Sequence, residues 1–197
     1  MDKTHNDIEV LQQRIALFND QQAYNDLFVH FYQSLQQFAF SFLKSKQLSE
    51  ETVSDVFIKI WEKRAKLHTI TNLKLYLFTS TRNTALNYLK KQKGLQNLPA
   101  EDYWVELNSV FFDPEQLMVT AEMINKVQKA VHDLPPKCKM IFKLVKEEGL
   151  KYREVASLLH LSIKTVENQM TIALKKIGAE IGFEMHRSFS SPSKVYR

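Results

Sequence analysis

Side chains that can bind nucleic acid gather in one stretch of this chain, between residues 72 and 93. The stretch contains five lysine or arginine residues and no acidic residue, so it attracts phosphate groups. Its asparagine amides can hydrogen-bond base edges, and the ring of Tyr76 offers a surface on which an unpaired base can stack. The residues predicted to contact nucleic acid here are Asn72, Lys74, Tyr76, Thr79, Arg82, Asn83, Asn87 and Lys90.

Two further groups of polar residues precede this stretch. Residues 63–71 are predicted to form a loop, whose basic candidates are Lys63, Arg64, Lys66 and His68. His68 has no second ligand at a suitable spacing, so we interpret it as a surface residue rather than a metal ligand. A helix predicted to begin at Ser49 precedes the loop, and its polar face consists of Glu51, Asp55, Lys59 and Glu62. Taken alone, this face is either simply solvated or a docking surface for another protein.

The C-terminal half contains a helix-turn-helix pattern. A predicted helix over residues 152–159 is followed by a short turn that begins with His160, and Ser162 can cap the second helix. Ala156 is small, as required where the two helices cross, and Val166 is apolar where the second helix meets the first. Glycine is usual at the position of His160, but histidine tolerates the left-handed conformation better than most residues.

Helical periodicity separates a buried face from a reading face on the second helix of this motif. The predicted core face consists of Ile163, Val166, Met170, Ala173, Leu174 and Ile177. The opposite face consists of Lys164, Asn168, Thr171 and Lys175, flanked by Thr165 and Glu167. Such a face can enter the major groove of DNA, where asparagine pairs with adenine and lysine donates to guanine. Lys151 and Arg153 are placed to bind phosphates.

The remaining pattern predicts an all-α fold of two small helical domains. The chain has only 4 glycines and 5 prolines, which favours long helices over sheets and turn-rich folds. Apolar residues at helical spacing predict further helices at 20–42, 72–93, 123–133 and 137–148. Asp20 or Asn19 is expected to cap the first of these, and Thr71 or Asn72 the second.

Charge and chain breakers divide the sequence into four segments. We expect a helical domain at 1–93, an acidic connector at 94–122, a second helical domain at 123–182 and a flexible basic tail at 183–197. Residues 94–125 contain six acidic residues and no lysine or arginine, whereas basic residues outnumber acidic ones from residue 126 onward.

Several classes of function find no support in the residues. The sequence offers no nucleophile–base pair, no glycine-rich phosphate loop and no metal-ligand spacing, so we expect no catalysis, metal or cofactor. The single cysteine, Cys138, cannot form an intrachain disulfide, and we expect it in a helix. No segment resembles a signal peptide or a membrane span, so we expect a cytoplasmic protein without lipid contacts.

Together these motifs resemble the extracytoplasmic-function group of the sigma-70 family of RNA polymerase sigma factors, in the style common in Bacteroidetes. The resemblance runs from about Ala23 to Gly178. The family's clamp-gripping helix, promoter-melting helix and upstream-element reader are similar to residues 55–61, 76–91 and 162–170, respectively. Such motifs in the right order and at the right separation are far more specific than any one of them alone.

The resemblance implies a sigma factor that binds core RNA polymerase, recognises promoter DNA and assists promoter melting. The polar face of residues 51–62 would dock on the polymerase, and the 63–72 loop with the helix after it would hold the melted downstream element. The 164–175 face would read the upstream element as duplex DNA. Tyr76 and Asn87 stand where many members have tryptophan and aspartate, and these differences can retune promoter preference.

The resemblance also concerns the partners. It implies a protein that is monomeric when free of polymerase and that a membrane-anchored anti-sigma factor can hold inactive. The acidic connector would lie in a polymerase channel that normally holds nucleic acid.

Two other interpretations remain open. A regulator of the response-regulator type fits the helix-turn-helix, although the N-terminal half lacks the alternating strands and helices of a receiver domain. An adaptor or anti-sigma protein without DNA binding fits less well, because the 72–93 helix has no acidic residue. Promoter-selective transcription with core polymerase alone would separate these interpretations.

Overall fold

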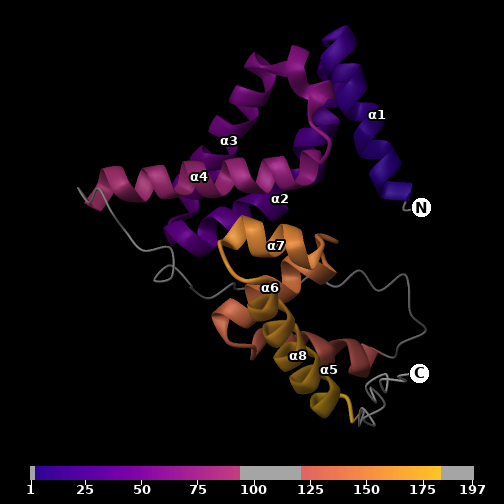
Figure 1. The fold of residues 1–197 in the computed structure, drawn as a ribbon, viewed down its shortest axis with the longest axis vertical. Helices are drawn as coiled ribbons and strands as arrows, with labels where there is room; N and C mark the ends of the chain where they lie inside the picture. Colours follow the sequence, from indigo (N-terminus) through magenta and orange to yellow (C-terminus); the bar gives the residue numbers. More distant parts are fainter. Residues whose placement is uncertain (1–2, 94–120, 183–197) are drawn as a thin grey trace, which may run out of the picture.

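The computed structural model describes residues 3–93 and 121–182 of the 197-residue chain. All regular elements in these two ranges are helices, which confirms the all-α prediction. None of these helices is long and apolar enough to cross a lipid bilayer. The predicted acidic connector lies almost wholly outside the described residues, and the predicted basic tail lies outside them entirely. Figure 1 shows the helices of the first range packed together and resting on those of the second.

The first range forms what we call the N-terminal group of helices. Its elements are α1 (Lys3–Phe18), α2 (Gln21–Leu43), α3 (Lys46–Glu62), the 3-10 helix η1 (Arg64–Thr69) and α4 (Leu73–Lys93). Asp20 caps α2, because its carboxylate accepts a hydrogen bond from the backbone N–H of Ala23 at 3.0 Å. Asn72 caps α4 in the same way, accepting from the N–H of Leu75 at 2.9 Å. Both caps confirm positions predicted from the sequence.

Aromatic side chains fix α3 and α4 to α2. Phe28 and Phe57 pack edge to face with their ring centroids 4.9 Å apart, and Phe38 packs in the same way on Phe78 at 5.1 Å. Phe57 and Phe78 are almost completely buried. The two helices that carry most of the predicted contact residues in this group therefore share one core.

Two local predictions in the N-terminal group are wrong. Helix α3 begins at Lys46 rather than at Ser49, and Ser45 caps it by accepting from the N–H of Leu48. Ser49 is buried in the first turn, where its hydroxyl donates to the carbonyl of Ser45. The segment predicted as a loop before α4 is the ordered helix η1, and α1 has no counterpart among the predicted helices.

The second range forms the C-terminal group of helices. Its elements are α5 (Ala121–His132), α6 (Pro136–Lys146), α7 (Tyr152–Leu159) and α8 (Ile163–Glu180). The pair α7 and α8 confirms the helix-turn-helix prediction. His160 adopts the left-handed conformation at φ 53°, and Ser162 caps α8 by accepting from the N–H of Thr165 at 3.0 Å.

The predicted core face of α8 is too wide. Val166, Met170 and Ala173 are buried as predicted, but Ile163 and Leu174 are 43% and 38% exposed. Helix α8 packs against α5, α6 and α7 through a narrow stripe, so apolar residues at its edges reach solvent.

Thr81 in α4 is fully buried, and its hydroxyl has no hydrogen-bond partner within the described part of the chain. Burying an unpaired hydroxyl costs about 1–3 kcal/mol, so we expect Thr81→Val to raise the free energy of unfolding by about 1 kcal/mol. Thr52→Val is the matched control, because Thr52 is equally buried but its hydroxyl donates a hydrogen bond to the carbonyl of Leu48 at 2.7 Å. Chemical denaturation of both variants tests this, and a destabilised Thr81→Val would contradict the expectation.

Candidate nucleic-acid interface

Helix α4 presents most of its predicted nucleic-acid contacts as one stripe. Tyr76, Asn83, Asn87 and Lys90 are exposed, and Thr79 is half-buried. These residues recur every three or four positions, so they lie on the same side of the helix. The stripe combines an aromatic ring, two amides and an ammonium group on a helix without acidic residues, which suits a single strand with unstacked bases.

Arg82 does not belong to this stripe. Arg82 is only 7% exposed, and burial lowers the pKa of its guanidinium. One step along an α-helix rotates the side chain by about 100°, which carries Arg82 from the side of Asn83 toward the core. The structure thus separates Arg82 from the other predicted contact residues of α4, and its contact with nucleic acid stays a prediction.

Exposed cationic and imidazole groups lie within η1 and directly before it. Lys63, Lys66 and His68 are exposed, whereas Arg64 is half-buried. The Arg64 guanidinium lies 4.6 Å from the ring centroid of Trp61 and donates to the Trp61 carbonyl at 2.8 Å. Arg64 is thus held by the fold, and the lysines are the more accessible cations of this segment.

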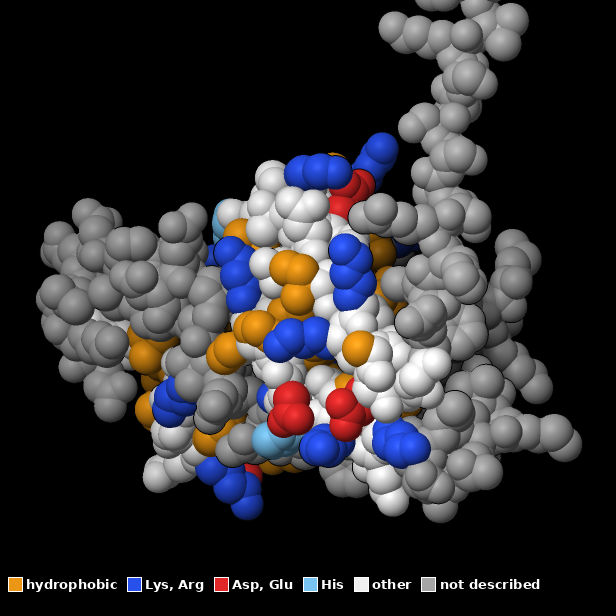
Figure 2. Space-filling model, turned by 90° about the horizontal axis from the view of Figure 1, so that it is seen from below, with side chains coloured by type: hydrophobic (Ala, Val, Ile, Leu, Met, Phe, Trp, Pro, Cys, Tyr) orange, Lys and Arg blue, Asp and Glu red, His pale blue; other side chains and the backbone are white. Residues whose placement is uncertain are grey.

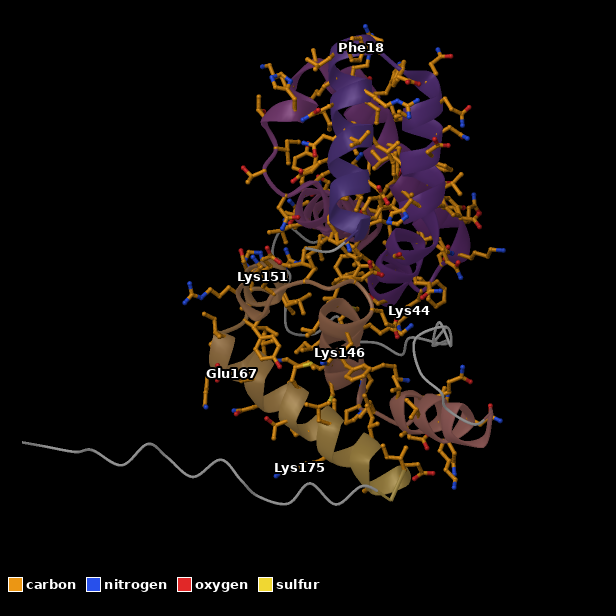
Figure 3. The ribbon with its side chains drawn as sticks, turned by 90° about the vertical axis from the view of Figure 1, so that its right-hand side faces the viewer. Phe18, Lys44, Lys146, Lys151, Glu167 and Lys175 are labelled. Carbon is orange, nitrogen blue, oxygen red and sulfur yellow. The ribbon has the colours of Figure 1, made fainter. Side chains whose placement is uncertain are left out.

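The reading face of α8 is open to solvent in the described structure. Lys164, Asn168, Thr171 and Lys175 are exposed, and Glu167 is half-buried. In Figure 3, Glu167 and Lys175 project from the side of α8 that faces away from the N-terminal group. Figure 2 views the molecule from below, on the side where the C-terminal group lies in Figure 1. On this face, lysine and arginine side chains surround apolar ones, and few acidic side chains lie among them.

The phosphate-binding candidates of the motif lie near its first helix. Lys151, directly before α7, and Arg153 within it are exposed, and Thr165 near the start of α8 is half-buried. The ammonium of Lys164 lies 3.4 Å from a carboxylate oxygen of Glu167. Solvent weakens this ion pair, so a DNA phosphate can take the place of the Glu167 carboxylate beside Lys164.

The predicted docking face of α3 is mostly exposed. Glu51, Lys59 and Glu62 reach solvent, whereas Asp55 is half-buried. The Asp55 carboxylate accepts a hydrogen bond from the hydroxyl of Tyr88 on α4 at 3.0 Å, and this bond raises the pKa of Tyr88. Asp55 therefore also holds α3 to α4, a role that its position in the sequence does not indicate.

Two residues predicted to contact nucleic acid form hydrogen bonds with the C-terminal group of helices instead. The side-chain amide of Asn72 donates to Glu154 at 2.8 Å, and the ammonium of Lys74 donates to the backbone carbonyl of Glu148 at 2.6 Å. Both residues are half-buried. A nucleic acid can reach these atoms only if the contacts between the two groups are exchanged for contacts with the strand.

A shallow pocket between the two groups contains ionisable side chains. It is lined by Gln37 and Phe38 from α2 and by Lys143, Glu147 and Glu148 from α6 and the residues after it. Burial raises the pKa of Glu147 to about 7, although Lys143 lies 3.9 Å away and opposes the shift. Burial also raises the pKa of Glu148 and lowers that of Lys143.

Glu147 should make folding depend on pH. Because its pKa rises from 4.5 to about 7 on folding, its stabilising contribution is complete below the lower value and is lost as pH rises through the upper one. We expect Glu147→Gln to match the wild type at pH ~4 and to be more stable by about 1 kcal/mol at pH ~8, after allowance for solvent screening of this partly exposed group. Thermal unfolding at both pH values tests this. Burial lowers the pKa of His30, but His30 is common to both proteins. If the difference in stability between Glu147→Gln and the wild type were the same at both pH values, the assignment to Glu147 would be contradicted.

The single cysteine of the chain, Cys138, lies within α6. The Cys138 side chain is buried and donates to the carbonyl of Gln169 at 3.2 Å, and burial raises the pKa of its thiol. A buried thiol with a raised pKa is a poor nucleophile. Among the described residues, no group of three or more His, Cys, Asp and Glu side chains is placed to hold a metal ion.

Comparison with protein families gives two matches. Residues 27–94 match the model described as "Sigma-70 region 2", and residues 124–177 match the model described as "Sigma-70, region 4". Together the two models match more than half of the chain. The α4 stripe lies within the first match, and the reading face of α8 lies within the second.

Curated relatives and a solved structure agree with these matches. The chain is 24% identical over 182 residues to the ECF RNA polymerase sigma-E factor of Escherichia coli K12, which covers 88% of this chain and 93% of that protein. The sigma-E factor of Haemophilus influenzae is 27% identical over 138 residues, covering 66% of this chain and 73% of that protein. The structure of CnrH in complex with the cytosolic domain of CnrY aligns with a TM-score of 0.50 at 19% identity, covering 89% of this chain and 97% of that chain.

Proposed function

Since this chain belongs to the extracytoplasmic-function group of sigma-70 family sigma factors, which act in promoter recognition and transcription initiation, we propose that it uses three separate surfaces. One surface docks on core RNA polymerase, one holds the melted downstream promoter element, and one reads the upstream element as duplex DNA. The observation that carries this proposal is that two exposed polar faces with nucleic-acid chemistry, on α4 and α8, lie on separate groups of helices.

The downstream element would lie along the α4 stripe and the exposed side of η1. Tyr76 would stack on a base, Asn83 and Asn87 would hydrogen-bond base edges, and Lys63 and Lys66 would bind phosphates. Extruding a base from the duplex costs a few kcal/mol, and contacts of this kind offset that cost. The polymerase would carry out all covalent chemistry.

The upstream element would enter against α8. The exposed amide of Asn168 would pair with adenine, Lys164 would donate to guanine, and Lys151 and Arg153 would bind phosphates on either side. In this proposal residues 1–93 form the polymerase-binding and melting domain and residues 123–182 the duplex-reading domain.

The proposed partners follow from this division of labour. We place the protein in the cytoplasm, where polymerase and promoter DNA are found, and propose an anti-sigma factor as a further partner. The acidic connector, 94–122, would occupy a cationic channel of the polymerase, since its net charge resembles that of a nucleic acid.

Run-off transcription tests the proposed function directly. Purified core polymerase, this protein and a library of genomic promoter fragments should give defined transcripts whose start sites share a sequence. Core polymerase alone should give none of them. Specific duplex binding by the protein without any such transcripts would favour a regulator of another class.

Asp55 gives a test of the docking face. We expect Asp55→Ala to weaken binding to core polymerase by about tenfold, because removing one partner of an interfacial charge pair costs roughly 1–3 kcal/mol. Tyr88→Phe is the matched control, since it removes the hydrogen bond between α3 and α4 but keeps the carboxylate. Equal losses in the two variants, measured by fluorescence anisotropy, would assign the effect to the fold and not to docking.

A further inference from the structure

Helix α1 holds the end of η1 through one buried side chain. Helix α1 lies outside the residues that match sigma-70 region 2. Gln12 on α1 is 6% exposed although its side chain is polar. Its amide nitrogen donates one hydrogen bond to the carbonyl of Leu67 at 2.6 Å and another to the carbonyl of Ile70 at 2.8 Å. A single residue thus binds two backbone groups that lie near the end of η1 and just beyond it.

The start of η1 is held by the turn that follows α1. Asn19 adopts the left-handed conformation at φ 52°, and its side-chain oxygen accepts a hydrogen bond from Nε of Arg64 at 2.5 Å. An ion pair between Arg14 and Asp20, with 2.7 Å between nitrogen and oxygen, braces this turn. Both ends of η1 are therefore connected to α1 and to the residues directly after it.

These contacts restrict the segment that carries the exposed groups Lys63, Lys66 and His68. A mobile segment loses conformational entropy when it binds a strand, and that loss weakens binding. The Leu67 carbonyl also accepts from the N–H of Ile70 at 3.0 Å, so the Ile70 carbonyl is the one that depends on Gln12. Leaving this part-buried carbonyl without its donor is unfavourable, so the bond from Gln12 keeps the backbone here in one conformation. The segment is therefore ordered before any strand arrives.

We propose that Gln12 and Asn19, which hold the two ends of η1, are positioning residues for the binding of the melted downstream element. This inference rests on the function proposed above for η1 and α4. Gln12 is buried, so it acts through the backbone of η1 and touches neither the strand nor the polymerase. In this proposal an extruded base of the downstream element would sit against η1. Gln12 would then contribute to the affinity for the strand and to the selectivity for that base, because a site discriminates between bases only while its shape is fixed.

The test uses the holoenzyme formed from core polymerase and the full chain. Gln12→Met keeps the length of the side chain and removes both donors, and Gln13→Met is the matched control because Gln13 is exposed on the same helix. The probe is a fluorescent single-stranded oligonucleotide carrying the non-template strand of the downstream element identified by run-off transcription. A set of oligonucleotides with each base changed in turn gives the selectivity.

We expect Gln12→Met to lower affinity for the probe by about tenfold and to reduce discrimination between matched and changed bases, as for a loosened pocket. Binding of core polymerase and of the duplex upstream element should stay within about twofold, as should all properties of Gln13→Met. Unchanged selectivity in a folded Gln12→Met holoenzyme would overturn the proposal, and so would an equal loss of polymerase binding.

A second variant covers the case in which Gln12→Met does not fold. Asn19→Gly removes the acceptor for Arg64, and glycine adopts positive φ without strain. The same loss of selectivity is expected, and a folded Asn19→Gly holoenzyme with wild-type selectivity would overturn the proposal. A wild-type holoenzyme that binds no strand of its own promoter would refute the proposed function of η1 and α4, and this inference with it.

Discussion

Replacing Asn168 by alanine is expected to remove most recognition of the upstream promoter element and to leave core polymerase binding unchanged. Asn168 is exposed on α8, one turn after Lys164 and in the middle of the reading face. Loss of a bidentate contact with a base costs about 1–3 kcal/mol, which corresponds to roughly a five- to 150-fold loss in promoter affinity. The loss should vanish on promoters whose upstream element has been scrambled, because the contact is then absent in the wild type as well.

The matched control is another replacement of an exposed asparagine by alanine, made in the N-terminal group of helices. Asn87→Ala removes an exposed amide from the α4 stripe, so it should impair opening of the downstream element and spare recognition of the upstream one. Footprinting measures duplex binding, and permanganate reactivity of unpaired thymines measures opening. If both variants impaired the two steps alike, α4 and α8 would not divide the promoter between them.

Local chemistry explains which parts of this fold are predictable from the sequence. The caps at Asp20, Asn72 and Ser162 each involve a side chain and an N–H three residues later, so their residue types are visible in the sequence. The turn at His160 is equally local, and apolar spacing is enough to predict α7 and α8. Ser45 and Ser49 are both suitable caps, however, and the tertiary core decides in favour of Ser45.

Contacts between distant residues explain what the sequence does not reveal. Gln12 is polar and lies in a helix whose apolar pattern is short, but it binds carbonyl groups 55 and 58 residues away. Asn72 is predicted to contact nucleic acid from its type and position, yet its partner in this structure is Glu154, 82 residues along the chain. Residue types indicate that such groups can bind something, whereas their partners depend on how the helices pack.

Replacing Phe57 by alanine is expected to destabilise the N-terminal group severely. Phe57 is 1% exposed, packs on Phe28, and its backbone carbonyl accepts a hydrogen bond from the hydroxyl of Tyr24 at 2.9 Å. Removing a buried phenylalanine side chain costs about 3–5 kcal/mol, a large part of the stability of a small domain. Thermal unfolding should show a markedly lower midpoint, and an unchanged midpoint would mean that Phe57 is not part of the core.

The neighbouring residue separates stability from polymerase docking. Ile58 is 54% exposed on α3, next to Lys59 of the predicted docking face, so Ile58→Ala should change the free energy of unfolding by less than about 0.5 kcal/mol. If this face docks on the polymerase, Ile58→Ala should still weaken binding, because an apolar side chain buried at an interface contributes about 1–2 kcal/mol. Below its unfolding midpoint, Phe57→Ala should lose binding only in proportion to its unfolded fraction. Wild-type affinity in Ile58→Ala would exclude Ile58 from the interface, and together with wild-type affinity in Asp55→Ala it would move the docking surface to another part of the chain.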